Sequence, residues 1–152
     1  MNRRNAFTMI ELVFVIVILG ILSAIALSKL SATRDDARLS QMAKSISISI
    51  GEVVANAVAR GIVPSSEAEW VDASKNIASL RANGLAVVTG SNDVEFAIGG
   101  VSDCLVFHLA AVAGVQSLTI VKPASSVELC QRLQGMFANS AYPLRGGNVN
   151  YD

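Results

Sequence analysis

The chain has 152 residues, which fits one domain with an appendage. Twelve lysines and arginines balance twelve aspartates and glutamates, and this zero net charge argues against a broad nucleic-acid-binding surface. Apolar residues make up 52% of the chain, but much of the excess lies between Phe7 and Leu27, so the remainder has the composition of an ordinary soluble domain.

The first predicted element is a membrane-spanning helix over residues 7–28. Counting from Phe7 gives 22 residues with one charge, Glu11. At ~1.5 Å per residue such a helix is about 33 Å long, which matches the roughly 30 Å of bilayer hydrocarbon. β-branched residues are abundant here, but a lone strand cannot satisfy its backbone in lipid, so a helix is predicted.

This segment has three possible interpretations. It could be a removable secretory signal, with Arg3 and Arg4 as its positive region and residues 24–26, A-I-A, as its cleavage site. The length of the apolar stretch and the acid near its start argue against that interpretation. It could also be a plain membrane anchor with Glu11 near the interface. In the third interpretation, the chain is cleaved between Ala6 and Phe7, ahead of the apolar run.

Residues 3–12, RRNAFTMIEL, resemble the processing site of type IV pilins and type II secretion pseudopilins. The resemblance covers roughly the first 40 residues and rests on a short basic leader, a small residue, Phe, Glu and a long apolar helix. It implies that a prepilin peptidase removes the leader, residues 1–6, by cleaving after Ala6, and then methylates the new N-terminus on Phe7. Glu11 would become the fifth residue of the mature chain, where the family has its characteristic acid.

Two positions depart from the family's pattern. Ala6 stands at the cleavage site where glycine is usual, which implies slower processing. Ser28 stands near the end of the apolar run, where many pilins have a proline, so no proline kink is expected.

Glu11 is predicted to be an assembly residue. A carboxylate in lipid requires a partner, and an isolated chain offers only its own N-terminus. In a stack of parallel, axially offset helices, the carboxylate of one chain could meet the α-amine of Phe7 in the next. That contact is stronger in a low dielectric than in water, and it would set the axial register. The alternative is an interfacial acid that faces the lipid headgroups.

The membrane topology has two opposing indications. The leader has two arginines, whereas four basic residues follow the span: Lys29, Arg34, Arg38 and Lys44. The positive-inside count therefore favours the opposite orientation. The resemblance implies a single-pass protein of the bacterial inner membrane with its C-terminal domain in the periplasm.

The helix is predicted to continue over residues 29–60. Apolar residues recur at helical spacing, in one stripe of Leu39, Met42, Ile46, Val53 and Ala57 and a neighbouring one of Ile50, Val54 and Val58. The alternation in SISISI, residues 45–50, would suit a strand, but its alanine-rich flanks favour a helix. Gly61 and Pro64 should end it.

Residues 61–152 are predicted to form a small globular domain. A helix is expected between Ser65 or Ser66 and Asn83-Gly84, and a short helix over residues 125–137 with Ser125 and Glu128 as a capping box. Between them lie four strand-like runs: Leu85–Thr89, Val94–Ile98, Cys104–Ala110 and Val115–Val121. The predicted fold is α+β: a long N-terminal helix, membrane-spanning in its first half, that packs on a small antiparallel sheet, which is also the pilin arrangement.

Cys104 and Cys130 are the two cysteines of the chain. In a translocated domain such a pair is predicted to be oxidised, the alternative being two buried thiols. The disulfide would close a loop of about 26 residues and stabilise the fold by roughly 3–4 kcal/mol. Many pilins likewise have a C-terminal region bounded by a disulfide.

The sequence predicts no catalytic site, metal site or cofactor. His108 is the one histidine and is interpreted as a core or sheet-face residue. Cys104 and His108 would make only a pair of ligands, whereas a structural zinc site needs four. Residues 91–95, SNDVE, group oxygen ligands in a predicted β-turn; a calcium site, which some pseudopilins have, is the alternative. Asp35 and Asp36 are expected on a solvated face beside Arg34 or Arg38.

Three functions remain open. The first is a structural subunit of a type IV pilus or type II secretion-type filament, which implies as partners a prepilin peptidase, other pilins or pseudopilins, membrane lipid, an inner-membrane platform and an external assembly ATPase. The second is a minor tip or competence pilin that binds DNA or a surface, for which the neutral charge gives no support. The third is a periplasmic enzyme with an ordinary signal peptide, whose mature chain would begin near Leu27.

Overall fold

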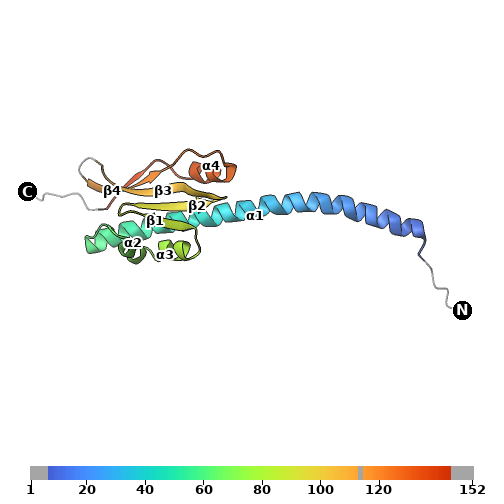
Figure 1. Ribbon diagram of the computed structural model, residues 1–152, viewed down its shortest axis with the longest axis horizontal. Helices are drawn as coiled ribbons and strands as arrows, with labels where there is room; N and C mark the ends of the chain where they lie inside the picture. Colours follow the sequence, from blue (N-terminus) through green and yellow to red (C-terminus); the bar gives the residue numbers. More distant parts are fainter. Residues whose placement is uncertain (1–6, 113–114, 145–152) are drawn as a thin grey trace, which may run out of the picture. The chain divides into compact units, whose positions relative to one another are not determined.

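The computed structural model describes residues 7–112 and 115–144, without the side chains of Leu27 and Ser28. Ala6 and the rest of the predicted leader lie outside the described residues, as do residues 113–114 and 145–152 of the predicted globular domain. The chain divides into two compact units, one up to Arg38 and one from Leu39 onward, the globular unit. Figure 1 shows the elements of both.

The first element, α1, is a helix of 52 residues, Met9–Arg60, so the predicted helix is confirmed, including its SISISI segment. The serine hydroxyls of this segment are hydrogen-bonded within the helix: Ser47 Oγ donates to the Ala43 carbonyl at 2.9 Å and Ser49 Oγ to the Ser45 carbonyl at 3.0 Å. Gly61 ends the helix with φ of +68°, in the left-handed region, while its N–H donates to the Ala57 carbonyl at 2.8 Å.

The first unit is the N-terminal half of α1. Every described side chain from Phe7 to Ala26 is exposed, although nearly all are apolar. Helix α1 has the length and hydropathy to cross a membrane, and none of its most apolar window is buried within the chain. Beyond that window, Arg38 forms an exposed ion pair with Asp35 at 3.8 Å, as expected. An apolar helix surface of this size is covered by lipid or by another protein.

The globular unit contains a five-stranded antiparallel sheet in the order β1-β2-β3-β4-β5. The strands are β1 (Ala86–Thr89), β2 (Asp93–Ile98), β3 (Val101–Val112), β4 (Val115–Val121) and β5 (Ala141–Pro143). The four predicted strands are confirmed, with β3 longer than predicted at both ends. Strand β5 was not predicted; it pairs with β4 through Tyr142 and Leu118, and the next residue, Leu144, is fully buried.

The core lies between the C-terminal half of α1 and one face of the sheet. The predicted stripe of Leu39, Met42, Ile46, Val53 and Ala57 is buried. On the sheet side, Phe96 and Phe107 pack edge to face with ring centroids 4.6 Å apart. Trp70 is also fully buried, and its indole N–H donates to the Ser91 carbonyl at 3.3 Å. The predicted α+β class with a pilin-like architecture is thereby confirmed.

The single helix predicted between residues 65 and 84 is two helices, α2 (Glu67–Ala73) and α3 (Lys75–Ala82). Ser66 caps α2, as one of the two predicted caps. Ser74 makes the break, because it adopts an extended backbone (φ −140°, ψ 114°) and its Oγ accepts the Ile77 N–H at 3.0 Å. It therefore ends one helix and caps the next.

The predicted capping box at Ser125 and Glu128 is wrong. Helix α4 spans Glu128–Gly135, and its N-cap is Val127, which makes no side-chain cap. Ser125 Oγ instead accepts the Val127 N–H at 3.2 Å, a local turn that ends before the helix begins. Figure 1 shows α4 beside β3 and α3 beside β1.

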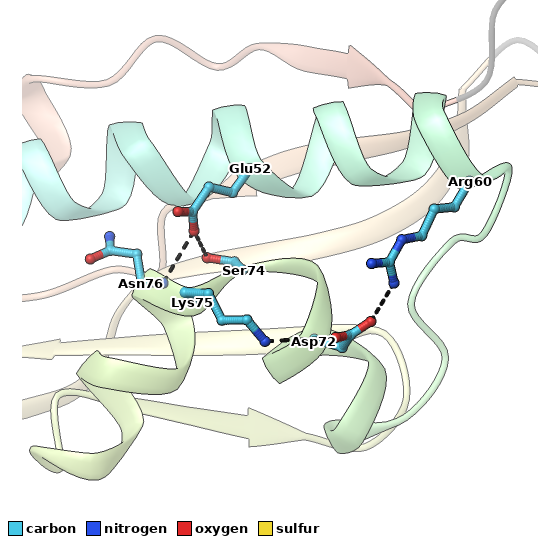
Figure 2. A network of polar contacts seen from close by, with 6 residues as sticks. All are labelled: Glu52, Arg60, Asp72, Ser74, Lys75 and Asn76. Carbon is cyan, nitrogen blue, oxygen red and sulfur yellow. Dashed lines mark hydrogen bonds and ion pairs between the residues drawn. The ribbon is translucent and has the colours of Figure 1, made fainter.

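A polar network joins α1 to α2 and α3 (Figure 2). Glu52 of α1 accepts hydrogen bonds at one oxygen, Oε2, from Ser74 Oγ at 2.6 Å and from the Asn76 N–H at 3.1 Å. Near the end of α1, Arg60 contacts Asp72 at 2.6 Å, and Lys75 lies 3.6 Å from the other oxygen of that carboxylate. Because these residues lie at both ends of the α2–α3 junction, the network fixes the junction against α1.

Replacing Glu52 by alanine is expected to loosen α3. The carboxylate caps the first turn of α3 from another helix, and a hydrogen bond to a charged group contributes about 1.5–3 kcal/mol. We expect Glu52→Ala to lower the free energy of unfolding by about 2 kcal/mol and to speed amide exchange at Asn76 and Ile77. Glu52→Gln, which retains an acceptor oxygen, should lose less. Equal exchange in wild type and Glu52→Ala would show that this cap has no effect.

Glu69 should make helix α2 sensitive to acid. Hydrogen bonds from the Ser65 hydroxyl at 2.8 Å and the Ser65 N–H at 2.6 Å hold the pKa of the Glu69 carboxyl below its ordinary value. A lowered pKa means that the stabilisation is complete above the unfolded-state value and is lost as the pH falls through the folded-state value. NMR titration of Glu69 should show the lowered pKa, and Ser65→Ala should raise it; an unchanged titration in that variant would contradict the assignment.

Candidate functional site

The start of α1 is a capping box that joins Thr8 and Glu11. The Glu11 carboxylate oxygen Oε2 accepts from the Thr8 N–H at 2.9 Å and from the Thr8 hydroxyl at 2.7 Å. In return, the Glu11 N–H lies 3.4 Å from Thr8 Oγ1 and 3.1 Å from the Thr8 carbonyl. In a capping box, the side chain of a threonine at the N-cap accepts from the N–H of a glutamate three residues later, and the glutamate carboxylate accepts from the threonine N–H. Two free N–H groups at the helix start are thereby satisfied.

The capping box gives Glu11 a partner within its own chain. The carboxylate also lies at the positive end of the helix dipole, which favours an anion there. The sequence interpretation considered only the chain terminus as an internal partner and missed Thr8. The T-x-x-E spacing of residues 8–11 was the signal that could have revealed it.

Phe7 precedes the capping box and has 80% of its surface exposed. Its predicted partner in processing, Ala6, lies outside the described residues. Glu11 is likewise exposed, at the first turn of the apolar helix. The predicted N-terminal residue and the predicted assembly residue are therefore both accessible at the same helix end, where an incoming cation would meet a carboxylate already ordered by Thr8.

Cys104 and Cys130 form a disulfide in the structure, with their Cα atoms 5.6 Å apart. Cys104 lies in β3 and Cys130 in α4, and both are fully buried. Gln134 of α4 adds a second link, since its side-chain N–H donates to the Cys104 carbonyl at 2.7 Å. These contacts hold α4 against β3.

The remaining candidates do not assemble into a site. His108 lies on β3 and its Nδ1 is 2.5 Å from Asp93 Oδ1 on β2, a cross-strand pair on the sheet surface. Cys104 is in the disulfide and is not part of the His108–Asp93 pair. Residues 90–92 form the turn between β1 and β2. Within residues 7–112 and 115–144, no group of three histidine, cysteine or acidic side chains is placed to hold a metal ion.

Comparison with known families matches residues 1–27 to the prokaryotic N-terminal methylation motif. No curated protein matches the chain, and no solved structure does. The matched segment includes Ala6, Phe7 and Glu11, so the resemblance of the RRNAFTMIEL stretch is confirmed. The chain therefore carries, on a pilin-like α+β fold, the prepilin motif that type IV pilins and pseudopilins share.

Proposed function

We propose that this protein is a structural subunit, a pilin or pseudopilin, of a type IV pilus or type II secretion-type filament. A prepilin peptidase removes residues 1–6 after Ala6 and methylates the α-amine of Phe7. The mature subunit polymerises through the apolar segment of residues 7–28, with residues 29–60 joined to a globular domain of residues 61–152. The observation that carries the proposal is the methylation motif on an apolar helix whose described surface from Phe7 to Ala26 is entirely exposed.

Glu11 sets the axial register of the filament in this proposal. Its carboxylate is exposed and ordered at the beginning of α1, next to the position where the new amine of a neighbouring Phe7 would arrive. The two charges attract strongly in an apolar surrounding. Any other axial offset leaves the amine without a counter-charge and leaves the Glu11 carboxylate with only its hydrogen bonds from Thr8. Subunits added head to tail in this way form an open helical polymer.

Before assembly, the protein resides in the bacterial inner membrane as a single-pass protein with its globular unit in the periplasm. The disulfide between Cys104 and Cys130 supports this side of the membrane, because such bonds persist in the oxidising periplasm and are rare in the cytosol. The subunit has no catalytic role of its own. Its partners are the prepilin peptidase, an inner-membrane platform with an assembly ATPase, and other pilins or pseudopilins.

The mature N-terminus tests the proposal in one measurement. Mass spectrometry of the membrane-extracted protein should find N-methylated Phe7 as the first residue, and Ala6→Gly should be processed at least as fast as wild type. A first residue near Leu27 would instead indicate an ordinary signal peptide and would contradict the proposal. A mature chain that begins at Phe7 but is incorporated only in trace amounts would favour a minor tip subunit.

A further inference from the structure

An apolar groove lies beside α1 within the globular unit. One wall is α1 itself, and the other is the segment that follows α4 together with β5. The groove has a volume of about 700 Å³, within the range of roughly 300–1,000 Å³ typical of ligand-binding clefts. None of its lining residues is charged: Ser47, Ile50, Gly51, Val54, Ala55, Val58, Met136, Phe137, Ala138 and Tyr142.

The groove leaves large apolar side chains without cover. Along α1, Ile50 is buried, Val54 is half-buried and Val58 is 59% exposed. Met136 on the opposite wall is 53% exposed. That wall is held in place, because Lys122 Nζ donates to the Phe137 carbonyl. An open, uncharged groove with a fixed wall is the kind of surface that a protein partner covers.

Gly51 indicates what kind of partner fits. It lies in the interior of α1, where glycine is unfavourable relative to alanine. The globular unit gives no reason for glycine there, since a Cβ added at Gly51 would meet no atom within 4 Å. Ser47 and Ala55 stand four residues before and after it, so a row of small side chains runs along this wall. Such rows let a second helix approach closely.

We propose that the groove binds residues 12–26 of α1 from a second copy of the chain. That segment is an uncharged helix with every described side chain exposed, so it matches the groove in polarity. A helix also satisfies its own backbone, whereas an extended peptide would need a long free sheet edge. The α1 wall has no such edge, and the other wall offers only β5, an edge strand of three residues that includes Pro143. The inference rests on the proposed function, because polymerisation takes this segment out of lipid and requires another apolar surface to cover it.

The first test fills the groove without harming the fold. Gly51→Leu has open space around the new side chain and removes a glycine from a helix, so its Tm should be equal to or above that of wild type. Processing at Phe7 should also be unchanged. The yield of filaments should fall more than about tenfold. The matched control is Ala59→Leu, an exposed position of α1 outside the groove, which should assemble like wild type.

The second test identifies the occupant. Met136 is replaced by the photoreactive p-benzoylphenylalanine in full-length protein, and assembled filaments from a mixture of isotopically light and heavy chains are irradiated. Cross-linked peptides that join position 136 to residues 12–26 of a chain with the other isotope support the proposal. Cross-links to another segment, another protein or lipid, or no cross-link at all, would overturn it, as would wild-type filament yield from Gly51→Leu.

The two proposals fail in different ways. If the wild-type chain is not processed at Phe7 and forms no filaments, both the proposed function and the proposed role of the groove are contradicted. If wild-type filaments have a mature Phe7 terminus and Gly51→Leu also assembles normally, only the proposed role of the groove is contradicted. Loss of assembly in both Gly51→Leu and Ala59→Leu would also contradict the role of the groove, since the effect would then not be specific to the groove.

Discussion

Replacing Glu11 by alanine should strongly impair filament assembly while leaving membrane insertion and cleavage after Ala6 intact. The substitution removes the carboxylate that would pair with the α-amine of Phe7 in the next subunit, and each 1.4 kcal/mol lost changes an association constant tenfold. We expect the filament yield to fall more than about tenfold. The yield is measured by shearing and sedimentation, alongside mass spectrometry of the N-terminus. Glu11→Ala filaments at wild-type yield would show that Glu11 does not set the register.

Glu11→Gln separates the two roles of this side chain. Alanine removes both the negative charge and the cap that Thr8 and Glu11 form, whereas glutamine removes the charge and can still accept from Thr8. If the ion pair with Phe7 drives assembly, Glu11→Gln should fail as Glu11→Ala does. If the helix cap were what matters, glutamine would restore the filaments.

Removing the disulfide should produce the largest loss of stability. The Cys104–Cys130 bond closes a segment with a sequence separation of 26. Restricting the unfolded chain in this way contributes roughly 3–4 kcal/mol by the chain-entropy argument. We expect the double substitution Cys104→Ala and Cys130→Ala to lower the free energy of unfolding by that amount. Urea unfolding of the full chain in detergent can be followed by the fluorescence of Trp70, which is the single tryptophan and is fully buried.

A reductant provides the control for this substitution. It should shift the unfolding midpoint of wild type in the same direction and leave that of the double variant unchanged. A double variant with the wild-type midpoint would show that the contacts of α4, such as that of Gln134 with the Cys104 carbonyl, are sufficient without the covalent bond.

Long periodic patterns in the sequence predicted most of the fold. The stripe from Leu39 to Ala57 specified the buried face of α1, and it outweighed the strand-like alternation of residues 45–50. Within that segment Ile46 and Ile50, four residues apart, are buried, whereas Ile48 is exposed. Alternating apolar residues between glycine turns specified four strands. These features depend on neighbours in the sequence, which is why a single sequence reveals them.

The features that were missed depend on tertiary contacts or on single side chains. The break at Ser74 is stabilised by Glu52, which is 22 residues away in the sequence. Strand β5 is three residues long and contains Pro143, so it has no strand signature of its own. The helix near residue 128 was predicted, but Ser125 was assigned to its cap although its hydroxyl forms a local turn. In the predicted processing motif, Phe7 and Glu11 were identifiable from their order, whereas Thr8 was missed although the T-x-x-E spacing of residues 8–11 indicates a capping box.

The short strand β5 covers one edge of the sheet, which favours solubility at high local concentration. Strand β4 would otherwise present a row of free N–H and C=O groups, and such an edge promotes pairing with the sheets of other molecules. Three residues of β5 occupy that edge, and Pro143 has no N–H to offer to a further strand. The burial of Leu144 and the 2.8 Å hydrogen bond from its N–H to the Gln116 carbonyl keep β5 in place. This stretch therefore protects the β4 side of the sheet against amyloid-like edge-to-edge aggregation when many copies lie side by side.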